Sequence, residues 1–137
     1  MRLTRSAIMR AVKNRRVKAT ELSLRARLVA AGIRGWRMYA RDLPGTPDFI
    51  FPAARVAIFV DGCFWHGCPH CYRRPQSSQR YWDAKLDRNR QRDRLVTRLL
   101  RSQGWSVLRI WECDLPQKGT HRVALRISKA LSKLTPR

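Results

Sequence analysis

The sequence predicts a single α/β domain in which helices flank a mixed central β-sheet. Two patterns lead to this expectation. The run RVAIFV, residues 55–60, is apolar after its first residue and of strand length, which is typical of a central strand buried on both faces. Residues 80–103 instead repeat apolar side chains at helical spacing, and Gly104 ends the repeat. Strands that alternate with helices in this way pack as layers around one core.

The first expected helix begins after Thr20, which is a good N-cap, and ends at Gly32. Its inward face is expected to carry four apolar residues: Leu22, Ala26, Leu28 and Val29. Short strands are then expected over residues 36–39 and 48–51, with a turn rich in proline and glycine between them. A further strand over residues 105–111 and a last helix complete the domain. The last helix is indicated by Val123, Ile127, Ala130 and Leu134.

The long helix has an unusual inward stripe. Its expected members are Trp82, Leu86, Asn89, Asp93, Val96 and Leu100. Two polar residues, Asn89 and Asp93, therefore interrupt an otherwise apolar face. Either they turn to solvent beside the stripe, or the helix faces a polar site midway along its length. The second alternative is favoured.

The charge balance points to a polyanionic partner. The 137 residues include 30 Lys+Arg against 9 Asp+Glu, a formal net charge of +21. Hydrophobic residues still make up 44%, which argues against a disordered basic tail. Nucleic acid is the expected partner, because phosphate contacts with counterion release drive non-specific binding. No apolar span is long enough for a membrane helix. Residues 1–18 are expected to form a basic arm and residues 19–137 the folded domain.

Four cysteines indicate a metal site. No secretory signal pattern is present, so a reducing cytoplasmic location is expected, where thiols bind metal rather than form disulfides. Four thiolates make a closed tetrahedral site for structural Zn²⁺, which would pin a long irregular loop. The expected ligands are Cys63, Cys68, Cys71 and Cys113. His70 is an alternative to one sulfur, and four buried small apolar residues are the alternative to a metal site.

Asp48, Asp61 and His66 form a second candidate site. Carboxylates at the ends of adjacent strands can hold Mg²⁺ against a phosphodiester, and a histidine can act as base near neutral pH. Taken singly, the three residues read more simply as a turn acid, a loop acid and a zinc ligand or exposed ring. Together they form a pattern. "PD" at a strand start, followed by an acid at the end of the next strand, resembles the PD-(D/E)xK nuclease arrangement, although Cys63 stands where that arrangement has lysine.

Four motifs carry a more specific resemblance. They are LPGTPDFIF, IFVDGCFWHGCPHCY, YWDAKLDRNRQRD and GWSVLRIWECDL, and the N-terminal RSAIMRAVKNRRVKATE adds to them. This combination resembles the very short patch repair endonucleases, a branch of the PD-(D/E)xK nucleases. The resemblance implies a restriction-endonuclease-like core and a Mg²⁺-dependent enzyme. Such an enzyme nicks one strand of double-stranded DNA at T:G mismatches, which arise when 5-methylcytosine deaminates. A monomer that acts near the nucleoid is expected.

The resemblance also implies residue roles. Asp48 is the catalytic, metal-binding aspartate, and the backbone carbonyl of Val60 is the second Mg²⁺ ligand. His66 belongs to the catalytic group and Glu21 is its N-terminal acidic partner. Asp61 replaces a histidine of the best-known branch: either it supplies a second carboxylate to Mg²⁺, or it changes which residue acts as acid. Target specificity is therefore left open. One alternative is a related nicking nuclease with another target preference, and another is a zinc-stabilised DNA-binding protein without catalysis.

Aromatic and basic residues complete the expected DNA interface. By resemblance, Phe64, Trp65 and Trp82 insert into the base stack beside the mismatch, because a mismatched step is cheaper to unstack. Trp82 reads equally well as a core residue, whereas complete burial of both Phe64 and Trp65 is not expected. The arm is expected to contact the DNA backbone through Arg2, Arg5, Arg10, Lys13, Arg15, Arg16 and Lys18.

Overall fold

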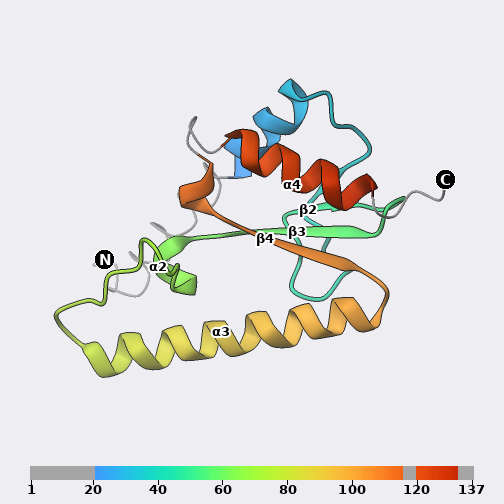
Figure 1. Cartoon of the computed structure of the whole chain (residues 1–137). Coiled ribbons are helices and arrows are strands. Elements are labelled where there is room, and N and C mark those ends of the chain that lie inside the picture. Colours follow the sequence, from blue (N-terminus) through green and yellow to red (C-terminus); the bar gives the residue numbers. More distant parts are fainter. Residues whose placement is uncertain (1–20, 116–119, 133–137) are drawn as a thin grey trace, which may run out of the picture.

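The computed structural model describes residues 21–115 and 120–132 (Figure 1). It confirms a mixed α/β domain. A helix spans residues 21–30, and the remaining elements in chain order are β1 (Arg37–Met38), β2 (Phe49–Phe51), β3 (Val56–Asp61), α2 (Cys63–His66), α3 (Gln79–Ser102), β4 (Ser106–Trp111), the 3₁₀ turn η1 (Glu112–Asp114) and α4 (Thr120–Ser132). The expected N-terminal arm, Thr20 and Leu134 lie outside the described residues.

The four strands form one mixed sheet in the order β1-β2-β3-β4. The first two pairs are antiparallel, whereas β3 and β4 are parallel, with Asp61 paired to Trp111 at their ends. Parallel neighbours need a long crossover connection, and α3 supplies it. Both strands therefore end at the same edge, so the segments that follow Asp61 and Trp111 lie next to each other.

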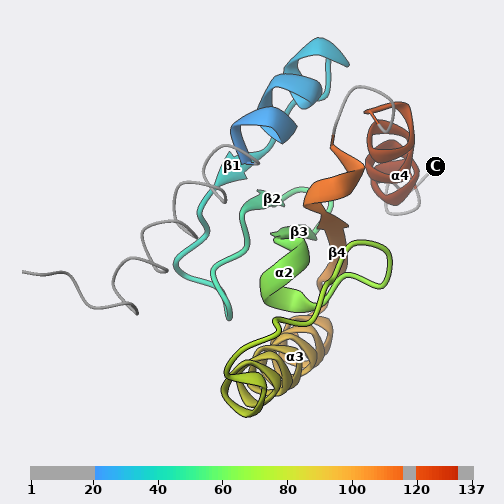
Figure 2. The ribbon, with the colours of Figure 1, turned by 90° about the vertical axis from the view of Figure 1, so that its left-hand side faces the viewer.

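Helices cover both faces of the sheet. Figure 2 shows α3 on one face, and the helix over residues 21–30 together with α4 on the other. The β3 strand is buried along its whole length, which confirms the expectation from its apolar sequence. Its alternate side chains join two apolar clusters. One is centred on Phe49 and Ile58, and the other contains Phe59 together with Leu100 of α3.

The inward face of the first helix differs from the expected one. Leu22 and Val29 are 46% and 64% exposed, so the prediction that they line the core was wrong. Leu24 and Leu28 are buried instead. At 100° per residue, positions 21, 24 and 28 share a stripe, and the sheet covers this stripe. The consequence is functional, because Glu21 lies on the buried side.

The expected inward stripe of α3 is confirmed. Leu100 is fully buried, and the other five members of the stripe are half-buried. Asn89 and Asp93 thus face the domain rather than solvent. Among residues 21–115 and 120–132, no helix combines the length and the apolar character needed to cross a membrane.

The loop after β3 contains a short helix, α2, where the sequence indicated only irregular structure. It ends at Gly67, whose backbone adopts the left-handed conformation with φ 69°. A Cβ atom at this position would lie 2.5 Å from the Nη2 atom of Arg90 on α3. The backbone angle favours glycine here, and any larger residue would also displace the Arg90 side chain.

Candidate active site and metal centre

A cleft of about 230 Å³ opens between β3, α2 and α3. It brings together four of the predicted catalytic and Mg²⁺-binding residues, namely Asp48, Val60, Asp61 and His66. Asp93 of α3 lines the same cleft. Residues from three separate segments thus converge at the carboxyl end of β3, where the sheet stops and backbone and side chains become accessible.

Asp48 is fixed to the neighbouring strand. It stands directly before β2, and its Oδ2 atom accepts a hydrogen bond of 2.7 Å from the backbone N–H of Val60. Burial raises the pKa of Asp48 to about 8, and a hydrogen bond with the Glu21 carboxyl adds to this effect. Two carboxyl groups that share a proton are a suitable donor set for a divalent cation, since the cation can displace the proton.

Glu21 reaches this position from the first helix. Its side chain is only 4% exposed. A hydrogen bond with Glu21 raises the pKa of Tyr39 to about 12, so the Tyr39 hydroxyl stays protonated and donates to the carboxylate. The helix over residues 21–30 and the strand segment around Tyr39 therefore enclose the Asp48–Glu21 pair from the side opposite α3.

His66 lies between two carboxylates. Its Nδ1 atom is 2.6 Å from Oδ2 of Asp93 and 3.9 Å from Oδ1 of Asp61. With Nδ1–H donated to Asp93, Nε2 is the ring atom that can accept a proton. Asp93 was not among the predicted site residues. The interrupted apolar stripe of α3 was the sequence signal that could have identified it.

Arg109 is a further site residue that the sequence analysis missed. Its Nη1 atom donates to both carboxylate oxygens of Asp61, at 3.0 and 3.1 Å, and its Nη2 atom donates to the backbone carbonyl of Asp93 at 3.3 Å. The guanidinium carbon lies 4.4 Å from the centroid of the Phe59 ring. A charged residue in the otherwise apolar strand SVLRIW was the available signal.

Asp61 is therefore held by a cation of the protein itself. Burial raises its pKa, while the charges of His66 and Arg109 act in the opposite direction. One ligand atom from each of Asp61, His66 and Asp93 lies within 4.8 Å of the others, so these residues can also hold a metal ion. The structure thus brings Asp61 to the same cleft as Asp48 and His66, but its carboxylate is engaged by Arg109.

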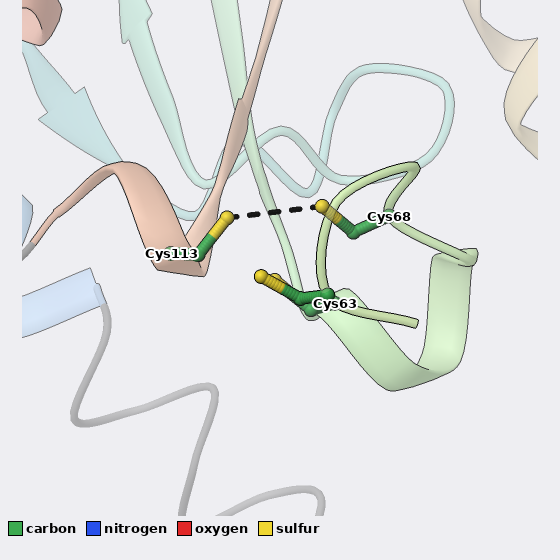
Figure 3. A group of neighbouring side chains, drawn as sticks. Cys63, Cys68 and Cys113 are labelled. Carbon is green, nitrogen blue, oxygen red and sulfur yellow. Dashed lines mark hydrogen bonds between the residues drawn. The ribbon is translucent and has the colours of Figure 1, made fainter. Parts of the chain in front are cut away.

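The four cysteines converge on one point. Their Sγ atoms lie within 4.8 Å of one another. Figure 3 shows the sulfurs of Cys63, Cys68 and Cys113 pointing toward each other, and those of Cys68 and Cys113 are 3.7 Å apart. A tetrahedral zinc ion with Zn–S bonds of about 2.3 Å needs sulfurs about 3.8 Å apart. The donor set and its spacing therefore fit zinc. His70 is exposed and is not part of the group.

Hydrogen bonds to η1 and to α3 attach the cysteine loop to the rest of the domain. The backbone N–H of Cys63 donates to Oε1 of Glu112 at 3.0 Å. The side-chain amide of Asn89 donates to the backbone carbonyl of Trp65 at 2.9 Å. The polar residues in the α3 stripe thus face a polar site, which confirms the favoured alternative. Glu112, in the WEC motif, was missed by the sequence analysis.

The three aromatic residues pack against one another beside the catalytic cleft. Ring centroids are 5.1 Å apart for Phe64 and Trp65, and 5.4 Å apart for Phe64 and Trp82. Trp65 is only 6% exposed, whereas Phe64 and Trp82 are half-buried. As expected, Phe64 and Trp65 are not both fully buried. The cluster lies outside the two apolar clusters of the sheet, so Trp82 is not a residue of the central core.

Comparison with known proteins is consistent with this geometry. Residues 2–73 match the family described as DNA mismatch endonuclease Vsr. The type II nicking enzyme V.XorIIP of Xanthomonas oryzae pv. oryzae is 38% identical over 125 residues, which cover 89% of each chain. The type II nicking enzyme V.NmeDIP of Neisseria meningitidis serogroup C is 37% identical over 99% of this chain and 97% of its own.

A third relative is the DNA mismatch endonuclease Vsr of Escherichia coli (strain K12). It is 40% identical over 114 residues, which cover 82% of this chain and 71% of the relative. The family match spans the segment from the N-terminus through the cysteine loop, and the relatives extend the match over α3 and β4. The chain therefore belongs to the Vsr family of DNA mismatch endonucleases, and it is a DNA endonuclease.

Proposed function

We propose that this protein is a Mg²⁺-dependent endonuclease that nicks one strand of duplex DNA at T:G mismatches. One observation carries the proposal: the His66–Asp93 pair and the Asp48–Glu21 pair line or adjoin the same cleft. A proton acceptor and a site for a divalent cation are the two groups that hydrolysis of a phosphodiester needs. The mixed sheet with α3 across its face is the core of a PD-(D/E)xK nuclease in this proposal.

Each residue of the cleft has a role in the reaction. The Asp48 carboxylate and the backbone carbonyl of Val60 would hold Mg²⁺, which would polarise the phosphoryl group and support the leaving oxygen. His66 accepts a proton at Nε2 from the attacking water. Asp93 holds the opposite side of the ring and stabilises the imidazolium that forms, as a carboxylate does behind a catalytic histidine elsewhere. The products carry a 5′-phosphate and a 3′-hydroxyl.

Asp61 and Glu21 support these groups. Glu21 shares hydrogen bonds with Asp48 and Tyr39, which fixes the orientation of the metal-binding carboxylate. Asp61 lies beside His66 and keeps Arg109 in the cleft, so it shapes the electrostatic field at the imidazole even where it does not touch the metal. Zinc bound by the four cysteines fixes the loop that carries His66, and its role is structural.

The aromatic cluster provides the means to select a mismatch. Phe64 and Trp82 are half-buried and line a small pocket with Trp65, which also lines the cleft, so they are available to stack against unpaired or weakly paired bases. Unstacking costs less at a mismatched step, and an aromatic ring returns part of that cost. The basic residues of the N-terminal arm then contact the backbone of the duplex.

A second candidate is a nicking enzyme with another target preference. The relatives from Xanthomonas and Neisseria are named type II nicking enzymes, and only the Escherichia coli relative among the three is named a mismatch endonuclease. The Asp61–Arg109 pair also supports this alternative. Asp61 stands where the best-known branch has histidine, so the charges at the cleft differ from those of that branch. The idea of a DNA-binding protein without catalysis does not hold, since the chain belongs to an endonuclease family.

The decisive experiment uses one duplex sequence that carries T:G, each other mismatch or perfect pairing, with the two strands labelled separately. With Mg²⁺ present, we expect a nick in one strand of the T:G duplex only. Chelation and the Asp48→Ala variant should each abolish the nick, while binding to the duplex is retained. Equal rates on all mismatches and on perfect DNA would reject mismatch selection. A nick that survives in Asp48→Ala would reject the assigned metal site.

A further inference from the structure

A second groove lies between α3 and the edge strand β4, and arginine side chains dominate its lining. Its volume is about 390 Å³. The six residues that line it are Asp93, Arg94, Thr97, Arg98, Arg101 and Arg109. Figures 1 and 2 show β4 at the edge of the sheet with α3 beneath it, so the groove opens along this edge. We refer to it as the arginine groove.

Three of the four arginines that line the arginine groove are not neutralised within the described part of the chain, whereas Arg109 pairs with Asp61. Arg94, Arg98 and Arg101 are exposed, and over residues 21–115 and 120–132 none of them forms an ion pair. Other exposed arginines do find acids, as Arg74 does at 2.8 Å from Asp83. The carboxylate of Asp93 is already engaged by His66. These unpaired positive charges therefore favour the binding of an anionic ligand in the arginine groove.

The spacing of the three arginines suits a polyanion with a regular repeat. Positions 94, 98 and 101 share one side of the helix and span about 10 Å at 1.5 Å per residue. Each DNA strand presents one phosphate per about 3.4 Å of duplex axis, so the row matches two to three consecutive phosphates. Thr97 accepts a hydrogen bond from Nε of Arg109 at 3.3 Å, which leaves its hydroxyl hydrogen available to a phosphate oxygen.

The arginine groove is continuous with the catalytic cleft. Asp93 and Arg109 line both, so they form the wall between the two cavities. We propose that the arginine groove holds the phosphate backbone of the substrate DNA on one side of the nicked phosphodiester. This inference rests on the proposed function, because it takes the cleft to be the place of cleavage. It adds a phosphate-binding subsite outside the catalytic residues, the aromatic cluster and the N-terminal arm.

The test compares two variants of the full chain with equal loss of charge. The groove variant carries Arg94→Gln, Arg98→Gln and Arg101→Gln. The control variant carries Arg34→Gln, Arg122→Gln and Lys129→Gln, which replace exposed residues away from α3. The equilibrium dissociation constant for a T:G duplex is measured across a range of salt concentrations. Each phosphate contact contributes about 0.9 to the slope of log K against log salt.

For the groove variant we expect the slope to fall by about two to three, since two to three contacts are lost. The control variant should keep a slope close to that of the wild type, because it loses charge but no contact. Equal changes in the two variants, or an unchanged slope in the groove variant, would overturn the proposal. Nicking by the wild type is measured in parallel, and its absence would count against the proposed function rather than against the groove.

Duplex truncation provides an independent readout. The duplex is shortened stepwise on one side of the mismatch or on the other. For the wild type, shortening one of the two flanks should cause an abrupt loss of affinity at the length where the DNA no longer reaches the arginine groove. The groove variant should lack this step, because it has no contact left to lose. Its defect should appear mainly as a higher KM rather than a lower kcat, since the three arginines do not touch the reacting phosphate. A step that persists in the groove variant contradicts the proposal.

Discussion

The Nδ1 atom of His66 lies 2.6 Å from Oδ2 of Asp93, although the two residues are 27 positions apart in the sequence. The contact joins α2 to α3 across the cleft. It fixes the orientation of the imidazole, so that Nε2 is free for proton transfer. In the proposed mechanism Asp93 acts through the imidazole of His66 and not on the substrate, so it is a positioning residue for that histidine.

We expect Asp93→Asn to lower the rate of nicking by about 10² to 10⁴, the usual contribution of general acid–base catalysis. The amide of asparagine cannot stabilise an imidazolium, and it favours the wrong tautomer of the ring. Single-turnover nicking with saturating protein measures the effect. The control is Asp87→Asn, which changes an exposed acid on the same helix. Equal rates for the wild type and Asp93→Asn would remove Asp93 from the mechanism.

Removing one partner of the Asp61–Arg109 pair should destabilise the protein more than removing both. Removing one partner of a buried ion pair costs about 3–5 kcal/mol, because the other charge is left unpaired. We therefore expect Arg109→Met to lower the free energy of unfolding by about 3 kcal/mol, and the double variant Arg109→Met/Asp61→Asn to recover most of this loss. Urea unfolding measures both. Arg74→Met, which breaks an exposed pair with Asp83, should have a much smaller effect.

The raised pKa of Asp48 makes the stability of the Mg²⁺-free protein depend on pH. The native carboxyl binds a proton up to about pH 8, whereas the same group in the unfolded chain releases it near its ordinary pKa of 3.8. Between these values the native state binds more protons, so the free energy of unfolding falls as pH rises. Asp48→Asn should flatten this dependence. The measurement is urea unfolding in the absence of Mg²⁺ at several pH values between 5 and 8.

The same proton competes with the metal. We therefore expect the apparent affinity for Mg²⁺ to rise with pH up to about 8, where Asp48 is half-deprotonated without metal. Two results together would contradict a proton shared between Asp48 and Glu21. The first is an Mg²⁺ affinity that does not change with pH, and the second is a difference in stability between wild type and Asp48→Asn that does not change with pH.

The geometry of the cysteine site favours Cys71 over His70 as the fourth zinc ligand. The sulfur of Cys71 lies with the other three sulfurs, whereas the imidazole of His70 does not join the group. We expect Cys71→Ser to lose bound zinc and to melt at a lower temperature, and His70→Ala to retain one zinc ion per chain and an unchanged melting temperature. Elemental analysis of purified protein measures zinc. Retention of zinc in Cys71→Ser combined with its loss in His70→Ala would assign the fourth ligand to the histidine.

Patterns with a clear period were enough to predict most elements of the fold. The apolar side chains of β3 are buried only if the run forms a central strand, and those of α3 are buried only if the segment forms a helix with that stripe facing inward. The first helix shows the limit of this reasoning, because it is short and its apolar residues can be grouped into two stripes. Only the sheet decides which stripe is covered, and it covers the one that contains Glu21, Leu24 and Leu28.

The candidate site was predictable where residue type and strand position combined, as for Asp48, Asp61, His66 and the cysteines. Asp93 and Arg109 were not predicted as site residues, for a different reason. Asp93 interrupts the apolar stripe of α3 and Arg109 stands among apolar residues of β4, so each was visible as an exception, but the partner of each is distant in sequence. The parallel packing of β3 and β4 with α3 as crossover brings these partners together, and periodicity does not identify which residues they are.

The pairing of Cys68 with Cys113 spans 45 positions and encloses all of α3. Closing a loop of this length costs about 3 kcal/mol in chain entropy before any strand contact compensates for it. A metal ion bound by both cysteines would offset this entropic cost, because its ligands come from the two segments that must approach each other before β4 can pair with β3. We therefore expect the supply of metal to set the rate at which β4 joins β3 during folding. Refolding should slow sharply in a chelator and recover when zinc returns.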